Sequence, residues 1–234
     1  MNKRKKGIIL SYVTTGISLI EGFILIPTLI RTLGKSEFGL YELMGSVIGY
    51  MAVMDFGLSD SITRFYSRYI ELGDKKKQAD VLGNAALIDG VITVFVMIIG
   101  IIIYNNLSNI FSNSLTSIEI TKAKSVFIVL LINLIFKLPS NIFTAIIRSN
   151  EEFAYLHYLS IFQHVFRTIV IIIVLNFQGN ILGVVIVQSI FNLLVIIGKW
   201  YYSIYKLNVE ISLNNWNKDL LRELLNYSFF IFNA

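Results

Sequence analysis

The sequence predicts an all-α integral membrane protein with six transmembrane helices and the start of a seventh. Of its 234 residues, 55% are hydrophobic and only 15% are charged, and the mean hydropathy is +0.69. Soluble domains average about 25% charged residues. The hydrophobic residues also gather in blocks of about 20 residues, the length that a helix needs to cross a bilayer. The composition therefore argues against a water-soluble enzyme.

Six complete hydrophobic blocks follow one another along the chain, at residues 7–30, 39–65, 79–104, 125–147, 155–175 and 181–202. The first is interpreted as a retained span, because it is longer than the apolar region of a signal peptide and no small-residue cleavage site follows it. Strands of a membrane barrel alternate apolar and polar residues over about ten positions. Stretches such as 91–104 do not alternate, so helices are favoured.

The C-terminal part of the chain predicts a linker and the beginning of another span. Residues 1–204 are expected to form the six-helix bundle, and residues 205–223 a cytoplasmic linker lying at the membrane interface. A short amphipathic helix in this linker would carry Trp216, Leu220, Leu221 and Leu224. Residues 224–234 would begin a seventh span, but a helix of about eleven residues covers only about half a hydrocarbon core. We therefore expect a fragment of a larger protein.

The distribution of basic residues predicts a cytoplasmic N-terminus. In that orientation fourteen of the 20 Lys and Arg residues lie on the cytoplasmic side and four lie outside, while Lys137 and Arg167 lie within spans. This asymmetry follows the positive-inside rule. The basic runs at 3–6 and 75–77 would lie against anionic lipid headgroups, which accounts for the net charge of +5 without a nucleic acid as partner.

Polar residues inside the predicted spans form stripes along the helices. A charged group at the centre of a bilayer costs about 3 kcal/mol on insertion scales, so such residues mark the side that faces protein or water. Projected at about 100° per residue, the stripes consist of Thr14, Ser18, Glu21 and Thr28; Glu42, Ser46, Gly49 and Asp60; Asn84, Asp89 and Thr93; Asn133, Lys137, Ser140, Asn141, Thr144 and Arg148; His157, Ser160, His164 and Arg167; and Gln188 and Asn192.

Two interpretations of these stripes are open. The polar groups could pair with one another between helices, with Glu21 neutralising Lys137 or Arg167. Alternatively they line a hydrated lumen, which is favoured because the stripes run along whole helices. His157 and His164 have the side chain that titrates near neutral pH, but without a carboxylate beside them on that helix they are weak candidates for metal ligands.

Sequence signatures of enzymes are missing. The chain has no Cys, which excludes disulfides, a thiolate nucleophile and cysteine-based metal sites. None of the patterns G-x-x-x-x-G-K-[ST], G-x-S-x-G, H-E-x-x-H and G-x-G-x-x-G occurs. We therefore predict no catalytic residue, no metal site and no cofactor.

Five short motifs along the chain point to one family of membrane proteins. They are LGKSEFG at 33–39, DFGLSDSITR at 55–64, GDKKK at 73–77, NEEF at 150–153 and LRELLNYS at 221–228. In type and in position relative to the predicted spans, these motifs resemble those of the polysaccharide flippases of the MOP (multidrug/oligosaccharidyl-lipid/polysaccharide) transporter superfamily. That family often has Pro directly after the last Ser, whereas this chain has Phe229 and Phe230.

The resemblance implies one MATE-like bundle of a larger two-bundle protein. The two bundles would rock against each other and carry an undecaprenyl-diphosphate-linked oligosaccharide across the bacterial cytoplasmic membrane. Its anionic headgroup would contact Lys137, Arg167, Arg148 and His164. Glu21 and Asp60 would couple transport to an ion or proton, and Asn133, Asn141, Thr144, Gln188 and Asn192 would line the lumen. Membrane lipids, a glycan polymerase and glycosyltransferases are the other partners that it implies.

Three alternatives remain open at this point. An ion-coupled multidrug antiporter of the same superfamily would need acidic and aromatic groups for cations, whereas Lys137 and Arg167 favour an anion. A membrane-embedded glycan polymerase or transferase usually carries catalytic groups on a large outside loop, and the longest outside connection, 105–124, holds no His or Asp. A purely structural membrane scaffold is the third.

Overall fold

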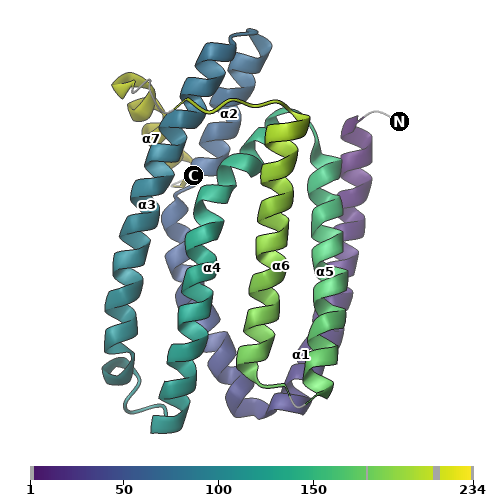
Figure 1. Ribbon diagram of the computed structural model, residues 1–234, viewed down its shortest axis with the longest axis vertical. Coiled ribbons are helices and arrows are strands. Elements are labelled where there is room, and N and C mark those ends of the chain that lie inside the picture. The colour runs from purple at the N-terminus through teal and green to yellow at the C-terminus, as the bar shows by residue number, and fades with distance from the viewer. Residues whose placement is uncertain (1–2, 178, 213–216, 233–234) are drawn as a thin grey trace.

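The computed structural model describes residues 3–177, 179–212 and 217–232, and every regular element within them is a helix (Figure 1). Trp216 of the predicted linker lies outside the described residues. The elements in order are α1 (Lys3–Ala52), η1 (Val53–Asp55), α2 (Leu58–Glu71), α3 (Lys75–Ile110), α4 (Ser117–Ser149), α5 (Phe153–Asn176), α6 (Ile181–Tyr201), η2 (Tyr202–Lys206) and α7 (Lys218–Phe232).

Five stretches of the described chain are long and apolar enough to cross a membrane, and they account for all six predicted spans. The first, Lys5–Glu71, is 67 residues long and contains both the 7–30 and the 39–65 block. The other four are Lys75–Ile110, Ser117–Ser149, Phe153–Asn176 and Ile181–Lys206. The prediction of an all-α membrane bundle is therefore confirmed.

The first two passes belong to one helix that bends at Gly34. Figure 1 shows α1 running down from the N-terminus, turning at the lower end of the bundle and returning towards α2. Gly34 has φ 83° and ψ 165°, a conformation that lacks a steric penalty only for glycine. No atom lies within 4 Å of the position that a Cβ would take, so the backbone angle alone requires glycine here.

The second predicted span, 39–65, is present, but its helix is interrupted. α1 ends at Ala52, and the single 3₁₀ turn η1 follows it. Phe56 and Gly57 then adopt left-handed conformations, with φ 48° and φ 72°, before α2 begins at Leu58. A left-handed residue ends an α-helix. The break leaves Asp55 half-buried and places the buried Leu58 at the start of α2.

The C-terminal helix begins earlier than expected. α7 starts at Lys218, so the end of the predicted linker and the predicted seventh span are one helix. It packs against α2, where the Ser61 hydroxyl donates a hydrogen bond to the Leu224 carbonyl at 2.9 Å. Leu220 and Leu224 are buried with Leu58 of α2 in one apolar cluster. These leucines therefore contact protein rather than lying only at the membrane interface.

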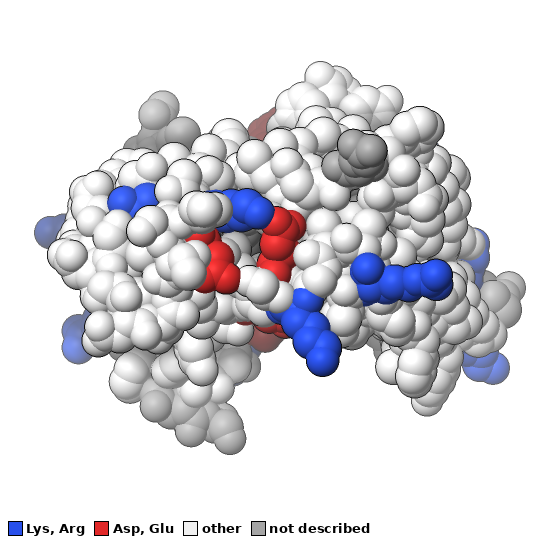
Figure 2. Space-filling model, turned by 90° about the horizontal axis from the view of Figure 1, so that it is seen from below, with Lys and Arg blue, Asp and Glu red and all other residues white. Residues whose placement is uncertain are grey.

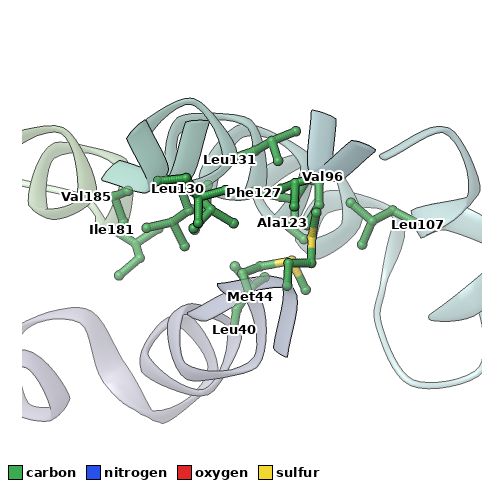
Figure 3. Packing of buried hydrophobic residues seen from close by; sticks show 14 residues of the cluster. Leu40, Met44, Val96, Leu107, Ala123, Phe127, Leu130, Leu131, Ile181 and Val185 are labelled. Atoms are coloured by element: carbon green, nitrogen blue, oxygen red, sulfur yellow. The ribbon is translucent and has the colours of Figure 1, made fainter. Parts of the chain in front are cut away.

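The largest apolar cluster joins α1, α3, α4 and α6. Figure 3 shows Leu40 and Met44 of α1 facing Phe127 of α4, with Val96 of α3 and Val185 of α6 beside them. Many other large hydrophobic side chains are exposed, which is the surface expected of a protein whose surroundings are hydrocarbon. The core thus holds the second pass, which includes the helix break, in place between α3 and α4.

Candidate functional site

A buried ion-paired group lies between α1 and α5, centred on Glu21. The Arg167 guanidinium donates to Glu21 Oε1 from Nη2 at 2.6 Å and from Nε at 3.2 Å. The Thr168 hydroxyl donates to the same oxygen at 2.8 Å, and His164 Nδ1 contacts Oε2. His164, Arg167 and Thr168 lie three and four residues apart, so they share one face of α5. Both oxygens of Glu21 are therefore satisfied.

The structure brings together three of the predicted site residues in this group. They pair with one another between two helices, which was the first of the two interpretations of the polar stripes. Arg167 and His164, expected at the substrate headgroup, here contact Glu21, which was expected to couple an ion. Lys137, the other cation considered for Glu21, is not among its partners in the described structure. Thr168 was missed, although its spacing from His164 could have indicated it.

A second polar group consists of amides between α4, α5 and α6. Asn192 Nδ2 donates to Asn133 Oδ1 at 3.2 Å, and Gln163 Nε2 donates to Asn192 Oδ1. On the neighbouring turn of α6, Gln188 Oε1 accepts from the Tyr41 hydroxyl at 2.8 Å. Gln163 and Tyr41 were not predicted. Both were missed because neither belongs to a long polar stripe in the sequence.

A third group follows α4 next to the helix break. Asn141 Nδ2 donates to Asp55 Oδ1 at 3.2 Å, which connects α4 to η1. One turn earlier, Lys137 is exposed and forms no ion pair within the described residues, although its charge acts on that of Asp55. The Thr144 hydroxyl is buried without a hydrogen-bond partner in the same part of the chain. This face of α4 thus keeps polar groups that the protein does not itself satisfy.

Cationic side chains gather along α4 and α6 towards the end of the bundle that holds the N-terminus. Arg148 Nη1 donates to Asp60 Oδ1 at 3.2 Å, in an ion pair whose side chains are 43% and 58% exposed. Lys199 of α6 lies near enough to Lys137 and Arg148 for mutual repulsion. From the sequence, Lys199 is only one of the fourteen basic residues predicted on the cytoplasmic side. Its spacing of seven from Asn192 places both on one helix face, which is the signal that could have found it.

Ion pairs and hydrogen bonds also join segments at both ends of the bundle. Near the N-terminus, the Lys3 ammonium donates to Glu152 at 2.6 Å, and this carboxylate raises the pKa of Lys3. At the opposite end, which Figure 2 views directly, Lys122 of α4 pairs with Glu37 just after the α1 bend. Ser36 donates to Glu119 in the first turn of α4. These contacts hold the bend against α4.

The two histidines have separate partners. His157 Nδ1 lies 3.3 Å from the Thr14 hydroxyl, whereas His164 contacts Glu21. Over the described residues, no group of three or more His, Asp or Glu side chains is placed to hold a metal ion.

The fold and its interhelical polar groups define a multi-pass integral membrane protein. The chain belongs to the polysaccharide biosynthesis protein family, whose model matches residues 4–234. No curated protein matches the sequence.

Solved structures show that the fold is that of half a MOP superfamily transporter. An outward-facing multidrug resistance MATE family transporter superposes with a TM-score of 0.74 at 16% identity, over 100% of this chain and 53% of its own. A MATE protein in complex with MaD3S gives 0.71 at 16% identity, over 97% and 52%. A MOP superfamily transporter from Pyrococcus furiosus gives 0.69 at 16% identity, over 97% and 49%. The chain spans about half the length of these transporters.

Proposed function

We propose that the chain is part of a carrier that moves an undecaprenyl-diphosphate-linked oligosaccharide across the bacterial cytoplasmic membrane by alternating access. Membership in the polysaccharide biosynthesis family and the fold of half a MOP transporter support it. The single observation that carries it is Lys137, an exposed cation within a membrane-spanning helix that has no ion-pair partner in the described chain. The asymmetry of basic residues supports a cytoplasmic N-terminus.

Lys137 would bind the diphosphate together with two neighbouring cations. Arg148 is three turns further along α4, and Lys199 of α6 interacts electrostatically with both. Three like charges near one another in an apolar protein repel, so an anion that enters between them is stabilised. Lysine and arginine are the side chains that bind phosphate through charge-assisted hydrogen bonds. The exposed Arg148–Asp60 pair is weak enough to open for such an anion.

The sugars would contact the amide groups of α4 and α6. Asn133, Gln188 and Asn192 can both donate and accept hydrogen bonds, as sugar hydroxyls require. Asn141 and Thr144 follow Lys137 one and two turns further along α4 and could serve the sugars next to the diphosphate. In this proposal the lipid tail stays in hydrocarbon, and the protein is a carrier rather than an enzyme. Glycosyltransferases would supply the substrate and a glycan polymerase would consume it.

A multidrug antiporter is the second candidate, because a structural neighbour is described as a multidrug resistance transporter. Such a carrier needs acidic groups for cationic drugs. Glu21, the acid predicted in the first span, is neutralised by Arg167. This pairing favours the glycan carrier over the drug carrier.

The test replaces Lys137 with Ala in cells that depend on this gene for surface glycan. A charge-assisted hydrogen bond contributes about 1.5–3 kcal/mol, so export of glycan should fall at least about tenfold. Lys206→Ala is the matched control, because Lys206 is also exposed but lies at the end of the sixth span. Unchanged export in Lys137→Ala, or loss of dye efflux with glycan intact, would refute the proposal.

A further inference from the structure

Asp89 is a buried carboxylate without a hydrogen-bond donor. It lies in α3, its exposed fraction is 1%, and neither of its oxygens has a partner in the described chain. The hydroxyl of Thr93, one turn further on, is also buried and unpartnered. An ionised carboxylate in such a place costs far more free energy than a neutral one. The side chain therefore needs a positive ligand that the protein itself does not supply.

The acidic residue whose charge acts on Asp89 is Asp55 at the helix break, and the two carboxylates repel each other when both are ionised. Asp55 has the donors that Asp89 lacks. It accepts from Asn141 Nδ2 at 3.2 Å and from the Ser59 backbone N–H in the first turn of α2. Two carboxylates in different environments divide their roles, the better-solvated one keeping the negative charge. Here Asp55 is that anion, and Asp89 is the group that binds a positive ligand.

We propose that Asp89, a buried carboxylate with no hydrogen-bond partner in the described chain, is a proton-binding site. Loading forms one O–H bond on a carboxylate oxygen of Asp89 and turns a hydronium ion into water. The pair then carries one negative charge instead of two. The Thr93 hydroxyl lies on the same face of α3, where it can accept a hydrogen bond from the new acid.

The surrounding charges favour a proton over a metal ion. The charges of Asp60 in α2 and Lys137 in α4 both act on Asp55, with opposite sign. A cation such as Na⁺ or Mg²⁺ needs several oxygen ligands together, whereas within the described residues no cluster of three acidic or histidine groups is placed to hold one. A proton needs a single oxygen. It therefore fits the one unsatisfied carboxylate.

A cavity next to the site offers a path for water. It has a volume of about 370 Å³ and lies between η1, α3 and α7. Asp55 lines it, as do Ile88 and Ile92, which flank Asp89 in the sequence. On the α7 side the lining residues are Leu225, Asn226, Ser228 and Phe229, none of which is charged. The buried Ser228 hydroxyl lacks a partner in the described chain, so it could hold a water there.

The site is placed to control the helix break. When Asp89 loses its proton, repulsion between it and Asp55 acts directly on η1, beside the left-handed residues Phe56 and Gly57. These residues connect the two parts of the second pass, and α7 packs against the second part. A proton at Asp89 would thus favour the closed packing seen here. This consequence for transport rests on the proposed function, whereas proton binding itself does not.

Infrared spectroscopy of the full chain in lipid vesicles tests the site, because a protonated carboxylic acid absorbs apart from a carboxylate. At neutral pH the wild type should show the absorbance of one buried carboxylic acid, and Asp89→Asn should lose it. Asp219→Asn, which changes an exposed acid in the first turn of α7, should keep it. Replacing Na⁺ by choline should have no effect. Asp55→Asn should lose the absorbance at a lower pH than the wild type, since the neighbouring negative charge that favours the protonated acid is gone.

Several results would overturn the proposal: no such absorbance in the wild type, its persistence in Asp89→Asn, or its dependence on Na⁺. Asn is neutral and nearly isosteric with the protonated acid, so Asp89→Asn should melt no lower than the wild type. If that variant nevertheless fails to fold, the Asp55→Asn titration decides. The infrared measurement does not depend on transport. The proton site can therefore be refuted while glycan export by the wild type is observed, and the proposed transport can be refuted while the proton site is observed.

Discussion

Two polar regions differ in how far the protein satisfies them: the Glu21 group between α1 and α5, and the polar face of α4 next to the helix break. The sequence predicted that both line one lumen. Around Glu21, every oxygen of the anion has a donor and Arg167 is neutralised. Around the break, Lys137 has no ion-pair partner and Asp89 has no donor within the described residues. The first group holds two helices together, whereas the second retains unsatisfied groups that a ligand or proton can complete.

The largest effect on stability is expected from Glu21→Gln. This substitution leaves the partly buried Arg167 without its counter-ion, and breaking a fully buried ion pair from one side costs about 3–5 kcal/mol, which is the upper limit here. Unfolding in mixed detergent micelles would measure the change in free energy. The double variant Glu21→Gln with Arg167→Met should recover much of the loss, since no buried charge then remains. A loss below about 1 kcal/mol in the single variant would show that the Glu21 group does not hold α1 and α5 together.

The next effect is expected from Asn192→Leu in the amide group. It removes the acceptor of Gln163 and the donor to Asn133 in one step. A buried polar group left without a partner costs about 1–3 kcal/mol, so the free energy of unfolding should fall by about that amount. Leu194→Ala, a change at an exposed position of α6, is the control for helix stability. Equal losses in both variants would argue against the hydrogen bonds.

A change at the helix break should have a smaller effect on stability. Gly57→Ala places a Cβ at φ 72°, with the nearest atom, Ile231 Cγ2 of α7, at 3.4 Å. The space is sufficient, but the left-handed backbone is strained for alanine, so we expect a loss of about 1 kcal/mol. Gly49→Ala in α1, where nothing lies within 4 Å of the added carbon, should be neutral or stabilising. Equal melting temperatures for the two variants would mean that the break is not rigid.

The exposed ion pair at the end of α4 should contribute less again. Asp60→Asn removes the partner of Arg148. Surface pairs contribute at most about 1 kcal/mol, so the melting temperature should change little, and less still at high salt. Arg148 would gain freedom to bind an anion. A large loss of stability that high salt does not reduce would show that Asp60 has a structural role beyond this pair.

The smallest effect on stability is expected from Lys137→Ala, in contrast to Glu21→Gln. The Lys137 side chain is exposed and makes no hydrogen bond or ion pair in the described chain, so its loss should change the free energy of unfolding by less than about 0.5 kcal/mol. The same variant should bind a soluble diphosphate more weakly than the wild type, as measured by calorimetry on the purified chain. A stability loss as large as that of Glu21→Gln would remove the distinction between the two regions.

Hydropathy predicted the helices well and their interruptions less well. Six blocks of suitable length were enough to place the passes, because a bilayer leaves a continuous apolar helix as nearly the only solution. The bend at Gly34 lies between the first two predicted spans, whereas the break at Phe56–Gly57 was missed, since a helix and a broken helix have the same hydropathy. The amphipathic helix expected in the linker and the expected start of a seventh span are one continuous helix, α7, from Lys218 to Phe232.

The candidate site shows the same limit. Helical projection correctly grouped His164 with Arg167 on one face, and Lys137 with Asn141 and Arg148 on another. It could not show which stripe faces which, so Glu21 had two possible cationic partners. It also left Asp89 as one polar residue among many, because an unpartnered carboxylate is recognised only when all its neighbours are known.

The sequence by itself determined that this protein crosses the membrane as a helical bundle and that its spans carry polar stripes, because hydropathy and helical periodicity are properties of single segments. Only the tertiary structure decided which stripes satisfy each other. Hydrogen bonds and ion pairs depend on distances of a few ångströms between helices far apart in the chain. In this structure Glu21 has partners at both carboxylate oxygens. Within the described chain, Lys137 has no ion-pair partner and Asp89 has no hydrogen-bond donor.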